Sequence, residues 1–233
     1  MEHLWKADLH LHTSCSRDAF NSPEKIITYA KKRGLDVIAI TDHNTMECVD
    51  TMMEYGRNNG IVVIPGIEVK TRQGELIAYY PENPIEKGLS LEETILAIRE
   101  AKGIIAVPHP LDRLRRSAVK MKNLEKIIHL IDIIEVWNAR TTFITDNVLA
   151  LKIAGEYKKG MSAGSDAHFP YEIGRCYVLI RPFNNKNGFF NSLKNARVVP
   201  GQSPLWVHIP STVAKRVDFV KKGGFYGRGA QKD

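Results

Sequence analysis

The sequence has 233 residues, 43% of them hydrophobic and 25% charged, a balance that fits one globular domain with a substantial core. No stretch reaches the roughly 18 consecutive apolar residues of a membrane helix, and no signal-peptide pattern is present, so we expect a cytoplasmic protein with no membrane partner. The formal net charge of +7 favours anionic partners such as phosphate esters or nucleic acid.

Short β-rich runs alternate with longer helical patterns along the chain, which is typical of a barrel or of an open parallel sheet. The predicted strands, in chain order, cover residues 7–12, 37–41, 62–69, 76–80, 104–107, 133–137 and 161–163. The predicted helices cover residues 22–34, 45–57, 119–130 and 145–157, with one more that begins at Ser90.

Two of these strands are predicted to be joined by a hairpin turn. The runs at 62–69 and 76–80 are too close for an intervening helix, so residues 71–74 are predicted to form a hairpin turn. If this turn pairs Lys70 with Glu75, then Glu68 and Glu75 share one face of the hairpin. Ser90 and Glu93 form a capping box at the start of the next helix.

Candidate metal ligands occur where the strands end. His10 and His12 end the first strand, two residues apart and therefore on one face. In a barrel the carboxyl ends of the strands converge, so five of the eight histidines would meet there with several carboxylates. Such a cluster would be strongly unfavourable unless cations held it together. The candidate ligands are His10, His12, Asp18, His43, Glu68, Glu75, His109, Asp166 and His168.

This interpretation rests on the whole set of candidate ligands, to which nearly every strand end contributes. A single HxH pair is more often a polar strand face than a metal site. Histidine combined with carboxylate suits Zn, Mn or Fe better than Mg or Ca alone. A carboxylate such as Glu68 can bridge two ions, and paired ions can activate water and hold a phosphoryl group. We therefore expect two or three divalent ions as cofactors.

The three cysteines indicate no disulfide framework, because they form no CxxC pair and their number is odd. We expect Cys48 and Cys176 to be buried or idle thiols. Cys15 lies between two candidate ligands and could contact a soft metal, but we do not expect it to do so.

The motifs in this order resemble those of the PHP family, the polymerase-and-histidinol-phosphatase domain. They read DLHLHT at 8–13, TDHN at 41–44, PGIE at 65–68, PHP at 108–110 and GSDAH at 164–168. The resemblance spans about residues 6 to 182. It implies an α/β fold, a distorted (β/α)7 TIM-like barrel with its metal site at the C-terminal face of the strands.

The resemblance also implies how the ligands divide among three ions. His10, His12, Glu68 and Asp166 would hold the first ion. Glu68 would bridge to a second ion, which His109 and Glu75 share. Asp18, His43 and His168 would hold the third. Many relatives have histidine at position 75, and glutamate is a harder, anionic ligand that would shift the preference from Zn toward Mn or Fe.

Several residues near the same face could contact substrate phosphate. Arginines at 113, 115 and 116 follow His109 on an expected loop, although they could equally form a solvated helix entry. Arginine can bind phosphate through two parallel hydrogen bonds. The residues that we predict to bind substrate are Arg140, Arg175, Asn138 and Arg113, with Arg140 and Arg175 favoured.

The end of the chain is unusually basic. From Gly201 onward there are six basic and two acidic residues, so this part supplies +4 of the formal +7. We expect a barrel domain at 1–200 and a basic extension at 201–233 that packs on the barrel or is partly flexible. Valines at 213, 217 and 220 favour an amphipathic helix at 211–222. The alternative is that this basic segment binds nucleic acid.

The function implied by the resemblance is metal-dependent hydrolysis of a phosphate ester, with Glu68, Asp166 and His168 as catalytic residues. The substrate would be a phosphorylated small molecule or a nucleotide, and nucleic acid is possible. One alternative is a non-catalytic relative that binds metal or associates with RNA. A second is a metal amidohydrolase, which also begins with HxH but fits the PGIE segment poorly. The oligomeric state is left open.

Overall fold

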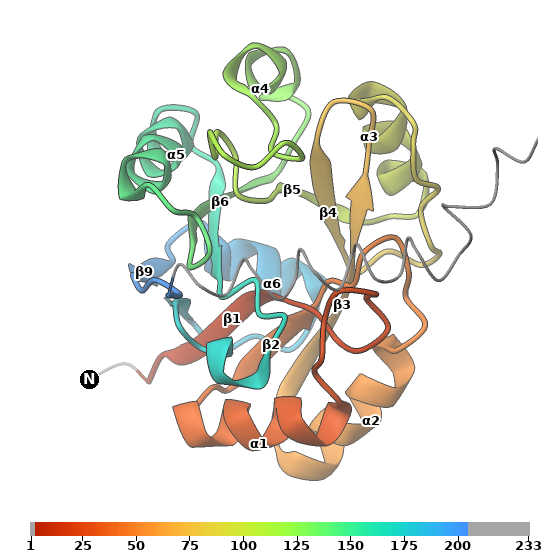
Figure 1. Cartoon of the computed structure of the whole chain (residues 1–233), viewed down its shortest axis with the longest axis vertical. Helices are drawn as coiled ribbons and strands as arrows, with labels where there is room; N and C mark the ends of the chain where they lie inside the picture. The colour runs from red at the N-terminus through yellow and green to blue at the C-terminus, as the bar shows by residue number, and fades with distance from the viewer. Residues whose placement is uncertain (1–2, 205–233) are drawn as a thin grey trace, which may run out of the picture.

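The computed structural model describes residues 3–204, which form one nine-stranded sheet curved into a nearly closed barrel (Figure 1). The strands follow the order β7-β6-β5-β4-β3-β2-β1-β8-β9. Their bounds are β1 (Trp5–Leu11), β2 (Val37–Ile40), β3 (Val62–Lys70), β4 (Glu75–Tyr79), β5 (Ile104–Val107), β6 (Ile133–Asn138), β7 (Gly160–Gly164), β8 (Tyr177–Ile180) and β9 (Arg197–Val199). The structure confirms the predicted α/β barrel.

Within the described residues, six helices pack against the barrel. They are α1 (Pro23–Arg33), α2 (Val49–Asn59), α3 (Leu91–Glu100), α4 (Met121–Ile127), α5 (Ile144–Glu156) and α6 (Lys186–Leu193), with a short 3-10 helix η1 (Pro170–Glu172). Figure 1 shows α1 and α2 on one side of the strands and α3, α4 and α5 on the other. Because helices cover the outside and side chains fill the inside, β2 and β5 are buried along their whole length.

The barrel closes between β1 and the segment that follows β7. The backbone N–H of Asp166 donates to the carbonyl of His10 at 2.7 Å, and that of His12 donates to Ala167 at 3.1 Å. Gly164 crosses β1 so closely that a Cβ at this position would lie 2.3 Å from the Cβ of His10, so only glycine fits. The seam of the barrel therefore runs through residues that the sequence marks as ligands.

The hairpin between β3 and β4 has the predicted register, with Lys70 opposite Glu75. Thr71 N–H donates to the carbonyl of Gly74 at 2.8 Å across the turn. Both β3–β4 and β4–β5 are antiparallel, so this part of the barrel departs from the regular alternation of strand and helix. The reversal brings the start of β4, and with it Glu75, to the same end as the carboxyl end of β5.

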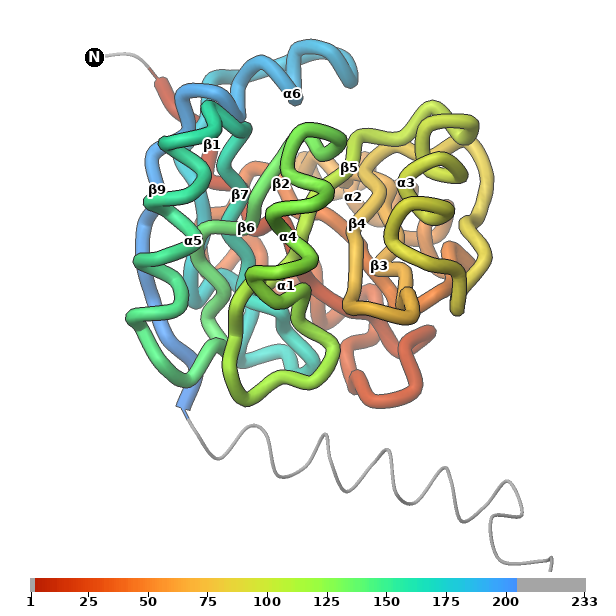
Figure 2. Tube along the Cα trace, turned by 90° about the horizontal axis from the view of Figure 1, so that it is seen from above, coloured from red at the N-terminus to blue at the C-terminus, as the bar shows by residue number. Residues whose placement is uncertain are grey.

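The opposite end of the barrel is closed by α6. Phe189 on this helix is fully buried, and its ring makes an edge contact with Tyr79 at 5.6 Å between centroids. The Tyr79 hydroxyl donates to the carbonyl of Leu9 at 2.9 Å inside the barrel. Figure 2 shows α6 at one end of the molecule and the loops after β1, β5 and β7 gathered at the other.

Sequence patterns missed the last two strands of the sheet. β8 and β9 pair antiparallel next to β1, and neither these strands nor α6 was among the predicted elements. Residues 201–204 continue along the end of β6, where the Trp137 ring N–H donates to the Gly201 carbonyl at 2.8 Å. Ser203 N–H donates to Ala139 at 2.7 Å. The predicted extension otherwise lies outside the described residues, as does the predicted helix at 211–222.

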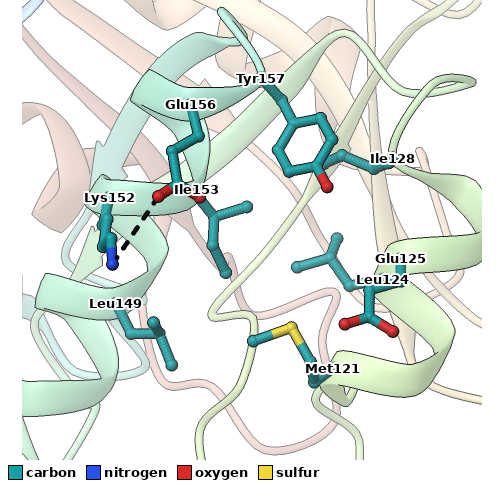
Figure 3. A pocket seen from close by; sticks show the side chains of 9 residues that line it. All are labelled: Met121, Leu124, Glu125, Ile128, Leu149, Lys152, Ile153, Glu156 and Tyr157. Atoms are coloured by element: carbon teal, nitrogen blue, oxygen red, sulfur yellow. Dashed lines mark ion pairs between the residues drawn. The ribbon is translucent and has the colours of Figure 1, made fainter.

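A surface groove of about 210 Å³ lies between α4 and α5 (Figure 3). Its walls include Met121, Leu124, Ile153 and Tyr157, and none of the nine predicted ligands lines it. The groove is therefore separate from the loops that carry the ligands. Within residues 3–204, no helix is both long and apolar enough to cross a membrane.

Candidate metal centre

All nine predicted ligands lie at the end of the barrel where β1, β2, β5 and β7 finish. Eight of them are less than 9% exposed, and the side chain of His43 is 22% exposed. β1 and the loop after it carry His10, His12 and Asp18, and His43 follows β2. The β3–β4 hairpin carries Glu68 and Glu75. His109 follows β5, and Asp166 and His168 follow β7. Burying so many ionisable groups together is unfavourable unless opposite charges compensate them.

The four residues predicted for a first ion face one another. His12 Nε2 lies 3.2 Å from Asp166 Oδ1 and 3.6 Å from Glu68 Oε2. His10 Nε2 lies 3.6 Å from Glu68 Oε1 and 3.7 Å from Asp166 Oδ1. Two imidazole nitrogens and two carboxylates thus converge on one point inside the barrel mouth.

Glu68 also links this group to the residues predicted for a second ion. His109 Nε2 lies 2.9 Å from Glu68 Oε1 and 3.7 Å from Glu75 Oε2. Glu75 is 7% exposed, so it points into the protein rather than away from it. Oxygens of Glu68 and Glu75 and a ring nitrogen of His43 lie within 4.8 Å of one another.

The third group lies on the other side of Glu68. His168 Nε2 is 3.3 Å and His43 Nε2 is 3.7 Å from the Asp18 carboxylate. The two rings are 5.7 Å apart between centroids. His43 Nδ1 is 2.8 Å from Glu68 Oε2, so this group is in contact with the other two.

The buried donor atoms fit divalent cations. His10 Nε2 and His43 Nε2 are both buried and have no hydrogen-bond partner in the described part of the chain. A buried nitrogen or oxygen without a partner is costly, and a cation would satisfy it. Imidazole and carboxylate together are the ligands of Zn, Mn or Fe.

The pKa shifts show how strongly these groups act on one another. Burial opposes the charged form of His43, yet Glu68 and Asp18 outweigh it and raise the pKa of His43 to about 9. Burial would also lower the pKa of His10, but Glu135, Asp166 and Glu68 raise it. The pKa of His12 is lowered by burial and by the charges of His43 and His168. A proton or a cation is therefore needed to balance the carboxylates.

Three buried carboxylates that we did not predict support the ligands. Glu135 on β6 lies 3.0 Å from His10 Nδ1, and its other oxygen accepts the backbone N–H of His109 at 2.5 Å. Asp8 accepts the hydroxyl of Ser165 at 2.6 Å, and burial raises its pKa to about 6. The sequence signal for Glu135 was a carboxylate in a largely apolar strand, and the signal for Asp8 was its spacing of two residues from the predicted ligand His10.

The third carboxylate, Asp42, fixes the loop after β1. It accepts hydrogen bonds from the Thr13 hydroxyl and from the Ser16 hydroxyl, each at 2.6 Å. The Ser16 oxygen in turn accepts the backbone N–H of His43 at 3.0 Å. Asp42 therefore ties the loop that carries Asp18 to the strand end that carries His43.

The predicted substrate residues lie near the centre but contact protein carboxylates. The Arg140 guanidinium pairs with the buried Glu172 at 2.9 Å. Arg113 pairs with Asp146 at 2.5 Å and its side chain is 55% exposed. Asn138 Nδ2 donates to Glu135 at 3.0 Å. Their substrate roles, and that of Arg175 beside η1, stay predictions.

Arg115 is the arginine that reaches the ligands. Its Nη2 donates to Asp166 Oδ2 at 2.6 Å, and its side chain is 20% exposed. The sequence placed it in a basic run with Arg113 and Arg116 and gave no reason to prefer it. Which of these three arginines points toward the predicted ligands depends on the path of the loop after β5. No periodic pattern in the sequence predicts that path.

Contrary to our expectation, Cys15 and Cys48 form a disulfide, with Cα atoms 6.1 Å apart and a sequence separation of 33. Cys176 is a buried free thiol, as expected. The two paired cysteines follow neighbouring parallel strands, β1 and β2, so the barrel brings together residues whose spacing carries no pairing signal. The bond joins the loop that holds Asp18 to the segment after His43.

Removing this disulfide should lower stability without touching a ligand. We expect Cys48→Ser to reduce the free energy of unfolding by about 2–4 kcal/mol, because the bond closes a loop of this length in the unfolded chain. Urea unfolding with and without reductant measures the effect. Wild type should respond to reductant and the variant should not, and the denatured oxidised protein should show one titratable thiol. Three thiols, or equal stability of both proteins, would contradict the pairing.

Comparison with known proteins gives one family. The sequence model of the PHP domain matches residues 8–196. An uncharacterized protein of Methanocaldococcus jannaschii is 34% identical over 182 residues, which cover 77% of this chain and 72% of the relative. A protein of Edwardsiella ictaluri named "Probable phosphatase" is 28% identical over 217 residues, 79% of this chain and 87% of that protein.

A solved structure shares the fold. A protein from Bifidobacterium adolescentis, whose description as a metal-dependent phosphoesterase is itself an inference, superposes with a TM-score of 0.63. The match covers 80% of this chain and 95% of that chain at 18% sequence identity. At this identity the likeness concerns the path of the backbone alone.

Proposed function

Because this chain belongs to the PHP domain family, we propose that it hydrolyses phosphate esters at a centre of two or three divalent cations. The observation that carries the proposal is the position of Glu68. One of its oxygens lies 2.9 Å from His109 and the other 2.8 Å from His43, while both face the His10–His12 pair. A single buried carboxylate thus contacts all three groups of ligands, as a bridging ligand must.

Cations held here would offset the negative charge of a phosphoryl group and lower the pKa of a nearby water molecule. The chain's own residues keep the ligands in place. Glu135 contacts both the His10 ring and the backbone of His109, so it holds two imidazole ligands in a fixed relation. Asp42 does the same for the loop of Asp18. We propose the nine predicted residues as ligands, with Glu68, Asp166 and His168 closest to the chemistry.

Arg115 is our candidate for the residue that orients the phosphate. Its guanidinium lies at the mouth, where Nη2 donates to Asp166 at 2.6 Å and Nε lies 3.8 Å from Asp112. A guanidinium has five N–H donors and binds phosphate oxygens through two parallel hydrogen bonds. Arg113 and Arg140 pair with Asp146 and Glu172, which are not predicted ligands, so we favour Arg115 over these two.

We expect two to three transition-metal ions per chain. Elemental analysis of protein purified without chelator and reconstituted with Mn²⁺ or Zn²⁺ measures the number. His168→Ala should lose about one ion, because it removes a ligand of the third group alone. The exposed His129, outside the centre, provides the matched control as His129→Ala. Less than one equivalent in the wild type would contradict the metal centre.

Glu75 is expected to set the metal preference. As a hard, anionic ligand it should make activity higher with Mn²⁺ than with Zn²⁺, and Glu75→His should shift the preference toward Zn²⁺. Glu75→Ala tests whether Glu75 is a metal ligand. Activity measured across a series of metal concentrations should show weaker metal affinity in the alanine variant. An alanine variant with unchanged affinity and rate would mean that Glu75 holds no ion.

The function itself is tested by screening the purified protein with added Mn²⁺ against four substrates. These are a phosphomonoester, a phosphodiester, a 5′-labelled single-stranded oligonucleotide and an N-acyl amide. Hydrolysis of a phosphate ester that a chelator abolishes and Mn²⁺ restores would support the proposal. Turnover of the amide alone would favour an amidohydrolase, and turnover of none, with ions bound, would favour a non-catalytic subunit.

A further inference from the structure

Three aromatic rings stack in a row beside the metal centre. The rings of Phe20 and Phe169 lie 5.1 Å apart between centroids with 13° between their planes. The rings of Phe169 and Tyr171 lie 5.6 Å apart with 11° between theirs. Near-parallel stacking at these spacings is a favourable arrangement of aromatic rings. The row comes from two loops, the one after β1 and the one after β7.

The loops that carry the row also carry the third group of ligands. Phe20 follows Asp18 by two residues, and Phe169 follows His168 directly. The backbone N–H of Phe20 donates to the His168 carbonyl at 2.7 Å, which joins the loops at this point. The backbone of Phe20 and that of Phe169 therefore lie next to the third group of ligands.

Packing within the barrel does not account for the row. Among the described residues, none of the three rings belongs to the buried hydrophobic clusters of the barrel. Phe20 is 50% exposed even though Phe169 covers one face of its ring, so the other face is open to solvent. An exposed ring beside a charged cluster offers a ligand an apolar face to stack on.

The row is held rigidly. One oxygen of Glu172 accepts the backbone N–H groups of His168 and Phe169, each at 3.1 Å. Glu172 is fully buried and pairs with Arg140 at 2.9 Å. The Arg140–Glu172 pair therefore fixes the turn that presents both a ligand and a stacking ring. A ring fixed in advance loses little freedom when a ligand stacks on it.

We propose that the Phe20–Phe169–Tyr171 row binds a nucleobase, so that the substrate is a nucleotide whose phosphate lies at the metal centre. The assignment rests on the proposed function and narrows it to base-bearing phosphate esters. Every base has a π face that stacks on an aromatic side chain, with little dependence on sequence. The basic net charge suits the same polyanionic ligands. A free nucleotide and the end of a single strand present the same chemistry.

The test compares adenosine 5′-monophosphate with ribose 5-phosphate, which carries the same phosphate and sugar but no base. With Mn²⁺ present, wild type should show a kcat/KM at least about tenfold higher for the nucleotide. Phe20→Ala should remove most of that preference through KM and leave ribose 5-phosphate unchanged. Phe20→Leu should resemble alanine, because it keeps apolar bulk but no ring. Tyr157→Ala, an exposed tyrosine in the α4–α5 groove, should change neither substrate.

Equal kcat/KM for the two phosphates in wild type, or a preference that survives Phe20→Ala, would overturn the stacking site while leaving phosphoesterase activity intact. If neither phosphate is hydrolysed, the proposed function fails instead, and calorimetric binding of the same two compounds decides the stacking site. Tighter binding of the nucleotide that Phe20→Ala abolishes would still support it, and equal binding would overturn it. A 5′-phosphorylated oligonucleotide, single-stranded and in a duplex, distinguishes a strand end from a free nucleotide.

Discussion

Replacing Glu68 with glutamine should remove more than nine-tenths of kcat for phosphate-ester hydrolysis and leave the fold intact. Glutamine has the shape of glutamate but no charge, so it fills the same buried space and cannot bridge two cations. Its neighbours His43 and His109 remain in place, at 2.8 and 2.9 Å from the side chain in the wild type. A tenfold loss corresponds to about 1.4 kcal/mol of transition-state stabilisation, and a bridging ligand should supply more than that.

Steady-state kinetics, elemental analysis and circular dichroism together measure this outcome. The exposed Glu86 provides a matched control, since Glu86→Gln makes the same chemical change at a residue that is not a predicted ligand. We expect full activity and full metal content in the control. A Glu68→Gln protein that keeps its ions and more than a tenth of wild-type kcat would show that Glu68 is not a bridging ligand.

Arg115→Ala should lower kcat/KM for a phosphate ester by about 100-fold. The substitution removes a guanidinium that donates to Asp166 at 2.6 Å and that we propose to orient the phosphate. Loss of one preorganised donor from an active site typically costs 10²- to 10³-fold. Arg115→Lys should recover part of the loss, because it keeps the positive charge without the planar pair of donors.

Arg116→Ala is the control, because Arg116 belongs to the same loop, is exposed and is not among the residues predicted to bind substrate. Its kcat/KM should stay close to the wild-type value. The comparison also requires metal analysis, since Arg115 contacts a ligand. If Arg115→Ala loses activity only in proportion to lost ions, then Arg115 stabilises Asp166 and does not bind phosphate.

The convergence of the nine candidate ligands could be predicted because these residues follow strand geometry. His10 and His12 share a strand face by their spacing, and the carboxyl ends of barrel strands meet by topology. The register of the β3–β4 hairpin, which places Glu75 near Glu68, followed from turn length. Each of these inferences needed the chain's local pattern and one rule of architecture.

The remaining features depend on contacts between segments far apart in sequence. β8 pairs with β1 across more than 160 residues, and no periodic pattern singled out this short strand or β9 beyond it. Nothing in the sequence spacing indicates that Cys15 meets Cys48, or that Arg140 meets Glu172. The choice of Arg115 over Arg113 depends on how one irregular loop turns. Such loops are governed by the specific hydrogen bonds that they make, which sequence patterns do not reveal.

The seam of the barrel has a consequence for dynamics. The N–H groups of His12 and Asp166 donate across it, and the ligands of the first group stand on both of its sides. Any opening that frees these two amides must also separate His10 and His12 from Asp166. Cations bound by both sides would oppose that opening, since they bind only the closed form. Hydrogen exchange at the amides of His12 and Asp166 should therefore be slower when cations occupy the centre, and its rate measures occupancy without any substrate.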